Sequence, residues 1–192
     1  MKNYPYLGLA VCLSIQCLPA QTMPELKAGD KLVYEVSTTD QTYNFTVTLT
    51  DLSNGIRFNW AMSDPINQEG SITITPDALK KSMKYHNYFQ PGSMELNEEC
   101  CVFTSQKNLR QITSKKSTQM DMQDGNKGTW AGSMDQFSFI YKGEEIYPQA
   151  YYLLLKHTSS EGYREVVVVP CTTYGLIVSM SLDWSIRLRS VE

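Results

Sequence analysis

The feature that most constrains the fold of this chain is a strict alternation of apolar and polar residues. From Tyr43 to Thr50, Tyr, Phe, Val and Leu occupy every second position, and Asn and Thr occupy the others. A period of two predicts a β-strand that is buried on one face and wet on the other. Asn54-Gly55 then predicts a tight hairpin turn, after which Ile56 to Met62 returns with the same period.

Similar short runs recur along the rest of the chain, which predicts about nine to eleven strands in all. Their spacing is typical of a sandwich or a barrel. We therefore expect a mainly β fold, a single antiparallel curved sheet in a half-barrel or sandwich, with one or two short helices. The further runs lie at residues 30–37, 71–75, 101–103, 118–122, 137–141, 145–147, 150–156, 163–169, 175–180 and 184–191.

Two segments carry helix signals instead. Thr75-Pro76-Asp77 combines an N-cap residue, a proline suited to the first turn and an acidic group near the positive helix end. Apolar residues then continue at helical spacing from Leu79 toward Phe89, and Pro91-Gly92 ends the segment. A second short helix is expected to start at Ser105.

Residues 1–20 predict an export signal. Lys2 supplies a positive charge, Tyr6 to Ile15 forms a short apolar run, and Ala20 precedes the expected cleavage site. The apolar run is shorter than the roughly 20 residues that span a bilayer. An alternative is a lipoprotein signal, in which Cys17 becomes acylated and anchors the protein to a membrane. We expect a periplasmic or secreted protein.

The remaining residues, 21–192, have a length that suits a single β-rich domain. Removal of Lys2 leaves 16 basic against 20 acidic residues, a net charge of −4 with histidine neutral. A weakly acidic chain is not attracted to phosphate backbones, so we expect no nucleic-acid partner. No transmembrane span is expected after cleavage.

Three cysteines remain in this domain: Cys100, Cys101 and Cys171. An oxidising compartment permits pairing, and a bridge between adjacent cysteines is strained. We expect a disulfide between Cys171 and either Cys100 or Cys101, which leaves one free thiol. The chain has no C-x-x-C or spaced Cys/His pattern, so no metal site is expected.

Motifs for common catalytic mechanisms are absent from the sequence. There is no G-x-S-x-G, H-E-x-x-H, P-loop or G-x-G-x-x-G motif. A nucleophile would have only His86 or His157 as its base, and His86 lies in an aromatic stretch that is typical of packing. We expect a non-enzymatic protein without catalytic, cofactor-binding or metal-binding residues and without a cofactor.

Large flexible side chains are plentiful, with 12 Tyr, 6 Phe, 3 Trp and 9 Met residues. Such side chains can line a cavity for a lipid or other apolar small molecule, or they can simply fill a β core. The candidate groove residues are Phe58, Trp60, Met83, Tyr88 and Phe89. The alternative function is a protein-interaction or structural module of the cell envelope, in which the Asn/Thr face or a sheet edge binds another envelope protein.

Four stretches also carry a family resemblance: Gly29 to Val36, Phe103 to Leu109, Tyr174 to Met180 and Ile186-Arg187-Leu188. Together the chain resembles exported TapB-like proteins of Bacteroidetes, which are similar in turn to the half-barrel lipoprotein carriers of the bacterial envelope. The resemblance covers most of residues 28–192. It implies a curved antiparallel sheet with a helical lid around an apolar ligand, and it supplies no functional residues to carry over.

Overall fold

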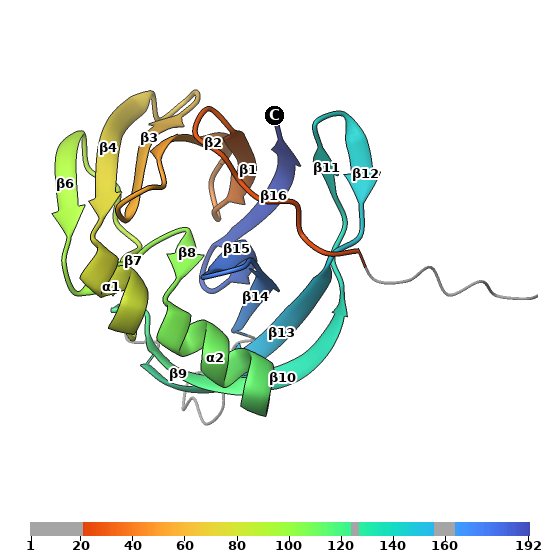
Figure 1. The fold of residues 1–192 in the computed structure, drawn as a ribbon. Coiled ribbons are helices and arrows are strands. Elements are labelled where there is room, and N and C mark those ends of the chain that lie inside the picture. The colour runs from red at the N-terminus through yellow and green to blue at the C-terminus, as the bar shows by residue number, and fades with distance from the viewer. Residues whose placement is uncertain (1–20, 124–126, 156–163) are drawn as a thin grey trace, which may run out of the picture.

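A single curved sheet dominates the protein and bends round into an almost closed barrel (Figure 1). The computed structural model describes residues 21–123, 127–155 and 164–192. Within them the predicted fold class is confirmed: the protein is mainly β with two short helices, and the curved-sheet alternative holds rather than the sandwich. The elements are β1 (Lys31–Ser37), β2 (Thr42–Asp51), β3 (Ile56–Met62), β4 (Gln68–Ile74), α1 (Pro76–Lys81), β5 (Lys84–Tyr85), β6 (Gly92–Leu96), β7 (Glu99–Cys100), β8 (Phe103–Thr104), α2 (Gln106–Lys115), β9 (Ser117–Asp121), β10 (Lys127–Gln136), β11 (Phe139–Tyr141), β12 (Glu144–Ile146), β13 (Gln149–Leu155), β14 (Glu165–Pro170), β15 (Gly175–Ser181) and β16 (Ser185–Val191).

The strand order around the sheet is β6-β4-β3-β2-β1-β16-β15-β14-β13-β10-β9-β5-β7. The long neighbouring strands pair antiparallel, as the hairpin signals predicted. Parallel pairs involve short or outlying strands: β4 with β6, β5 with β7 and β9, and β11 with β16. Along each strand the side chains alternate between the two faces of the sheet, which accounts for the period of two in the sequence.

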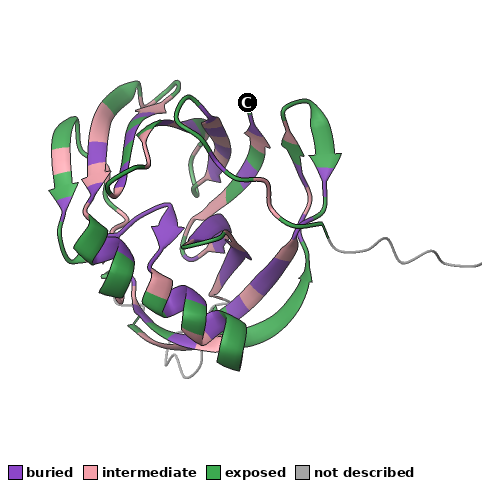
Figure 2. Cartoon of the chain, viewed as in Figure 1, coloured by how far each residue is buried: buried purple, intermediate pink, exposed green. Residues whose placement is uncertain are grey.

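The hairpin of β2 and β3 shows how the alternating pattern positions the core. Val47 lies opposite Trp60 and Leu49 lies opposite Phe58, and all four side chains are buried inside the barrel. The intervening Asn and Thr residues lie on the outer, wetter face, so the predicted two-sided strand is confirmed. Figure 2 shows the same division along several strands, with buried segments alternating with exposed ones.

The first and last strands of the described sheet lie side by side. β1 pairs with β16 from Leu32 opposite Val191 to Ser37 opposite Ser185. Backbone hydrogen bonds run from Lys31 N to Glu192 O at 3.0 Å and from Glu192 N to Lys31 O at 2.9 Å. This pairing joins the N-terminal and C-terminal halves of the sheet.

The first helix is shorter than predicted. It begins after its N-cap, Thr75, but ends at Lys81 instead of continuing toward Phe89. The Ser82 hydroxyl donates to Glu98 O at 2.6 Å, and the backbone turns to an extended conformation at Ser82. Local bonding of this kind competes with a helix, and the next residues instead form β5 and an extended segment.

The second helix is confirmed. Ser105 is its N-cap and accepts from Asn108 N at 3.1 Å, while Leu109 and Ile112 are buried beneath it. The expected strand at residues 101–103 is displaced to β8, because the backbone reverses at Val102. One long strand, β10, was not predicted at all.

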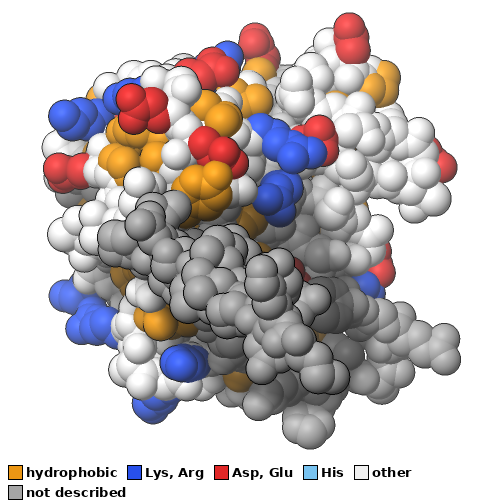
Figure 3. All heavy atoms as spheres, turned by 90° about the vertical axis from the view of Figure 1, so that its right-hand side faces the viewer, with side chains coloured by type: hydrophobic (Ala, Val, Ile, Leu, Met, Phe, Trp, Pro, Cys, Tyr) orange, Lys and Arg blue, Asp and Glu red, His pale blue; other side chains and the backbone are white. Residues whose placement is uncertain are grey.

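Charged side chains of both signs are interspersed on the face shown in Figure 3, with small apolar patches between them. In the described part of the chain, no helix is both long and apolar enough to cross a bilayer.

Candidate functional site: an apolar pocket at the barrel mouth

An open pocket of about 220 Å³ lies at one end of the barrel. At this end β1 and β3 finish while β2 and β16 begin, so side chains from four strands converge on the opening. A segment without regular structure, just after β5, completes the wall. The described lining residues are Val36, Thr38, Tyr43, Phe45, Met62, Asn87, Phe89, Trp184 and Ile186. We call this space the mouth pocket.

A second cavity of about 30 Å³ adjoins the mouth pocket. The two spaces share five lining residues, so they lie side by side; these residues are Phe45, Asn87, Phe89, Trp184 and Ile186. Its volume suits about one water-sized group. We call it the inner cavity; its remaining lining residues are Tyr34, Tyr85, Val102, Ile177 and Met180.

Aromatic rings form the wall between the two spaces and the core. The Phe89 ring lies 4.6 Å from the Phe45 ring and 5.5 Å from the Trp60 ring, both edge to face. The Tyr34 and Phe45 rings are 6.2 Å apart. These separations are those of favourable aromatic pairs, so Phe89 is held by specific contacts.

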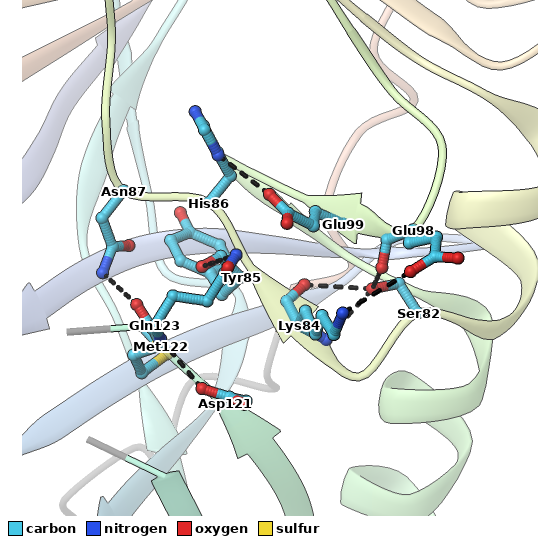
Figure 4. A network of polar contacts seen from close by, with 10 residues as sticks. All are labelled: Ser82, Lys84, Tyr85, His86, Asn87, Glu98, Glu99, Asp121, Met122 and Gln123. Atoms are coloured by element: carbon cyan, nitrogen blue, oxygen red, sulfur yellow. Dashed lines mark hydrogen bonds and ion pairs between the residues drawn. The ribbon is translucent and has the colours of Figure 1, made fainter. Parts of the chain in front are cut away.

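Polar contacts fix the segment that carries Phe89 (Figure 4). Asn87 Nδ2 donates to Met122 O at 2.8 Å, and His86 N donates to Cys100 O at 2.8 Å. The His86 ring nitrogen Nδ1 lies 2.9 Å from Glu99 Oε2. Because side-chain and backbone groups both anchor this segment, it forms a defined wall of the mouth pocket although it has no regular secondary structure.

Two tyrosines with hydrogen-bonded hydroxyls line the inner cavity. The Tyr34 hydroxyl donates to Ile177 O at 2.9 Å, and the Tyr85 hydroxyl accepts from Val102 N at 2.8 Å. Burial raises the pKa of Tyr34 well above its ordinary value, and neighbouring Tyr85 raises it further. Burial likewise raises the pKa of Tyr85. Both hydroxyls are therefore uncharged at neutral pH.

The backbone beside these hydroxyls is strained. Val102 has φ of +61°, which is unfavourable for a β-branched residue, and Phe103 N donates to Cys101 O at 2.5 Å across it. The turn is held by the Tyr85 hydroxyl on the Val102 N–H and by Ile177 N, which donates to Val102 O at 2.9 Å. Backbone strain of this kind is concentrated at functional sites, which supports this end of the barrel as the candidate site.

Of the five predicted groove residues, Phe89 alone lines the mouth pocket. Trp60 supports Phe89 from the core side and is 2% exposed, while Phe58 is packed in the core at 0% exposure. Met83 precedes β5 and lines neither space among the described residues, and Tyr88 points outward at 56% exposure. Phe58, Trp60, Met83 and Tyr88 were therefore wrongly assigned to the groove.

Most residues that line the mouth pocket were not predicted from the sequence. Phe45 and Ile186 lie on predicted strands and Trp184 lies in the bend just before β16, but nothing in the local sequence shows that β1 and β16 are neighbours. The resemblance implied a helical lid, whereas neither helix contributes a described residue to the pocket. The segment after β5 lines the pocket instead, through Asn87 and Phe89.

A polar groove of about 470 Å³ lies on the outer face of β2, β3, β4 and β6. It coincides with the wet Asn/Thr face, because Thr46, Thr48 and Asn59 all line it. Glu69 adds one negative charge, and Gly70 and Gly92 leave its floor without side chains. Hydroxyl and amide groups of this kind suit a polar partner.

Of the two candidate bases, only His86 lies within the described residues. No group of three or more His, Cys, Asp or Glu side chains suited to a metal occurs in the described ranges. His86 bonds to a carboxylate, and no hydroxyl or thiol of a described residue hydrogen-bonds to its ring. His157 and residues 1–20, with Cys17, lie outside the described residues.

The three cysteines of the domain are free thiols in the structure. Cys100 and Cys101 are buried, and Cys100 Sγ donates to Ala78 O at 3.5 Å. Burial raises the pKa of Cys100 and of Cys171 to about 12. The bridge from Cys171 to Cys100 or Cys101 stays a prediction for the oxidised protein.

Comparison with protein-family models, with curated proteins and with solved structures gave no match for this chain.

Proposed function

We propose that this protein is an exported, non-enzymatic protein of the cell envelope or the exterior, and that it binds a lipid or another apolar ligand in the mouth pocket. The observation that carries the proposal is the pocket's lining. Its walls are aromatic and aliphatic, and no described residue that lines it is charged. Apolar cavities with a few polar groups are typical small-molecule sites.

The size of the pocket limits the part of a ligand that it can hold. Its volume of about 220 Å³ is smaller than the roughly 300–1,000 Å³ of most ligand pockets. A cavity of about 150 Å³ suffices for benzene. The mouth pocket therefore suits a single ring or the end of an acyl chain, and a longer ligand extends out through the opening.

Trp184 provides a natural reporter of binding, because it lines both the mouth pocket and the inner cavity. Trp60 and Trp130 are buried in the core at 2% and 0% exposure. We expect 11-bromoundecanol to quench tryptophan fluorescence saturably, and undecanol to compete without quenching. Trp184→Phe should remove most of the quenched signal.

Two results would contradict the proposal. One is quenching that is absent, or that survives unchanged in Trp184→Phe. The other is a pocket variant that binds as well as the natural protein: Phe45→Asp places a charge in the lining and should abolish saturable quenching. Thr48→Asp, on the outer face, is its control and should leave binding unchanged. Native mass spectrometry of protein purified from its own envelope should additionally reveal a bound apolar molecule.

The second candidate function is a protein-interaction module of the envelope, and the outer polar groove favours it. A pull-down from envelope extract separates the two candidates. A stoichiometric protein partner that is lost in Thr48→Asp, together with no bound lipid, supports the interaction module. A bound lipid with no such partner supports the ligand-binding protein.

A further inference from the structure

The inner cavity differs from the mouth pocket in having two buried tyrosines in its lining. Tyr34 and Tyr85 both line it, and both hydroxyls are fully protonated for the reason given above. The Tyr34 O–H is already engaged, since it donates to Ile177 O. The Tyr85 oxygen accepts from Val102 N, but its own O–H donates to no described residue.

An unused donor at an apolar cavity has an energetic consequence. A buried hydroxyl hydrogen without an acceptor costs free energy that a suitable ligand atom recovers. The cavity of about 30 Å³ beside it has room for about one oxygen-sized group. Because the inner cavity adjoins the mouth pocket, a ligand whose body fills the mouth pocket can place one atom there.

The charge of that atom is also restricted. The described lining of both spaces contains no Lys, Arg, His, Asp or Glu side chain. A carboxylate or an ammonium group would lose its hydration without gaining an ionic partner, and that cost is several kcal/mol or more in apolar surroundings. A neutral acceptor carries no such penalty.

We infer that the pocket selects an uncharged apolar molecule that carries a carbonyl oxygen at its leading end, and that the Tyr85 hydroxyl donates a hydrogen bond to this oxygen. Ketones, aldehydes and esters with a ring or a short chain fit this description. The inference rests on the proposed function, since it specifies which apolar ligand the same pocket takes. The strained turn at Val102 contributes to this arrangement. The Val102 N–H donates to the Tyr85 oxygen, so the hydrogen of the Tyr85 hydroxyl is directed away from the turn.

Three probes with one ring each test the inference by calorimetry: acetophenone has a neutral carbonyl, ethylbenzene has none, and benzoate is charged. We expect acetophenone and ethylbenzene to bind and benzoate not to bind at neutral pH. Tyr85→Phe should weaken acetophenone about tenfold, the equivalent of one hydrogen bond, and leave ethylbenzene within about twofold. Tyr147→Phe makes the same chemical change at an exposed residue outside both spaces and should alter neither affinity.

A measurement on the natural protein avoids reliance on a variant that fails to fold. The infrared carbonyl stretch of bound acetophenone should lie at lower wavenumber than in hexane, because a hydrogen bond weakens the C=O bond. A hexane-like stretch, an unchanged acetophenone affinity in Tyr85→Phe, or tight binding of benzoate would overturn the inference while leaving apolar binding intact. Failure of both neutral probes to bind would refute the proposed function as well.

Discussion

Truncation of Phe89 is the sharpest test of the mouth pocket's architecture. The ring forms two edge-to-face pairs, at 4.6 Å with Phe45 and at 5.5 Å with Trp60. Two such pairs contribute about 1–3 kcal/mol together. Truncation of a fully buried phenylalanine to alanine costs about 3–5 kcal/mol. Because Phe89 is only partly buried, its truncation should cost less than the top of this range. We therefore expect Phe89→Ala to lower the free energy of unfolding by about 2–3 kcal/mol.

The neighbouring residue supplies a matched control. Tyr88 is 56% exposed and lies outside the pocket, so Tyr88→Ala should change the free energy of unfolding by less than about 0.5 kcal/mol. Urea unfolding followed by circular dichroism measures both changes. In a domain of this size Phe89→Ala should lower Tm by about 4–12 °C.

The same substitution has a second expected effect. Phe89 lines both the mouth pocket and the inner cavity, so its removal should merge them and admit a larger ring system such as naphthalene. Equal destabilisation by Phe89→Ala and Tyr88→Ala, or a larger effect of Tyr88→Ala, would refute the assignment of Phe89 to the wall. Unchanged selectivity between benzene and naphthalene would show that the two spaces are not continuous.

Four further predictions concern the rest of the chain. N-terminal sequencing of exported protein should begin near Gln21, and a mature chain that starts at acylated Cys17 would contradict this. Thiol counting on unfolded, unreduced protein should find one thiol per chain; a count of three would show that no bridge forms. In reduced protein, burial raises the pKa of Cys100 and Cys171 to about 12 from the ordinary value of 9.0. The contribution of these two buried thiols to the free energy of unfolding is therefore fully present below about pH 9. It is lost as the pH rises toward about 12, because the unfolded chain ionises there while the folded protein does not, by at most about 1.4 kcal/mol per pH unit for each thiol. Urea unfolding at a series of pH values should detect this loss. Finally, Gly132→Ala places a Cβ against the backbone carbonyl of Tyr152 on β13, so it should lower stability by about 1–3 kcal/mol or prevent folding, whereas an unchanged Tm would contradict the close approach.

The local sequence pattern was sufficient to predict the strands whose two faces differ most in polarity. β2 and β3 were predicted correctly because apolar residues occupy every second position and Asn54-Gly55 connects them. Ser105 correctly marked α2. β10 was missed because its sequence, KGTWAGSMDQ, contains two glycines and few β-branched residues. Pairing with β9 and β13 stabilises this strand, and its own propensity does not.

The candidate site was predictable only as a kind of site. Aromatic content indicated an apolar groove, but the sequence could not identify which aromatic residues would meet. Ile186 and Val36 lie opposite each other although 150 positions separate them, and such pairing leaves no local signal. The helical spacing from Leu79 onward also led to a wrong prediction, because the helix ends at Lys81 and, in the irregular segment after β5, Phe89 lines the pocket while Tyr88 is exposed.

The pairing of β1 with β16 has a consequence for biogenesis. β1 gains its second neighbour, and the mouth pocket gains Trp184 and Ile186, only after residues 184–191 have left the ribosome. Until then one edge of β1 is open, and the closed sheet cannot form. Closure of the sheet therefore waits for Ile186, which is synthesised 150 positions after its partner Val36.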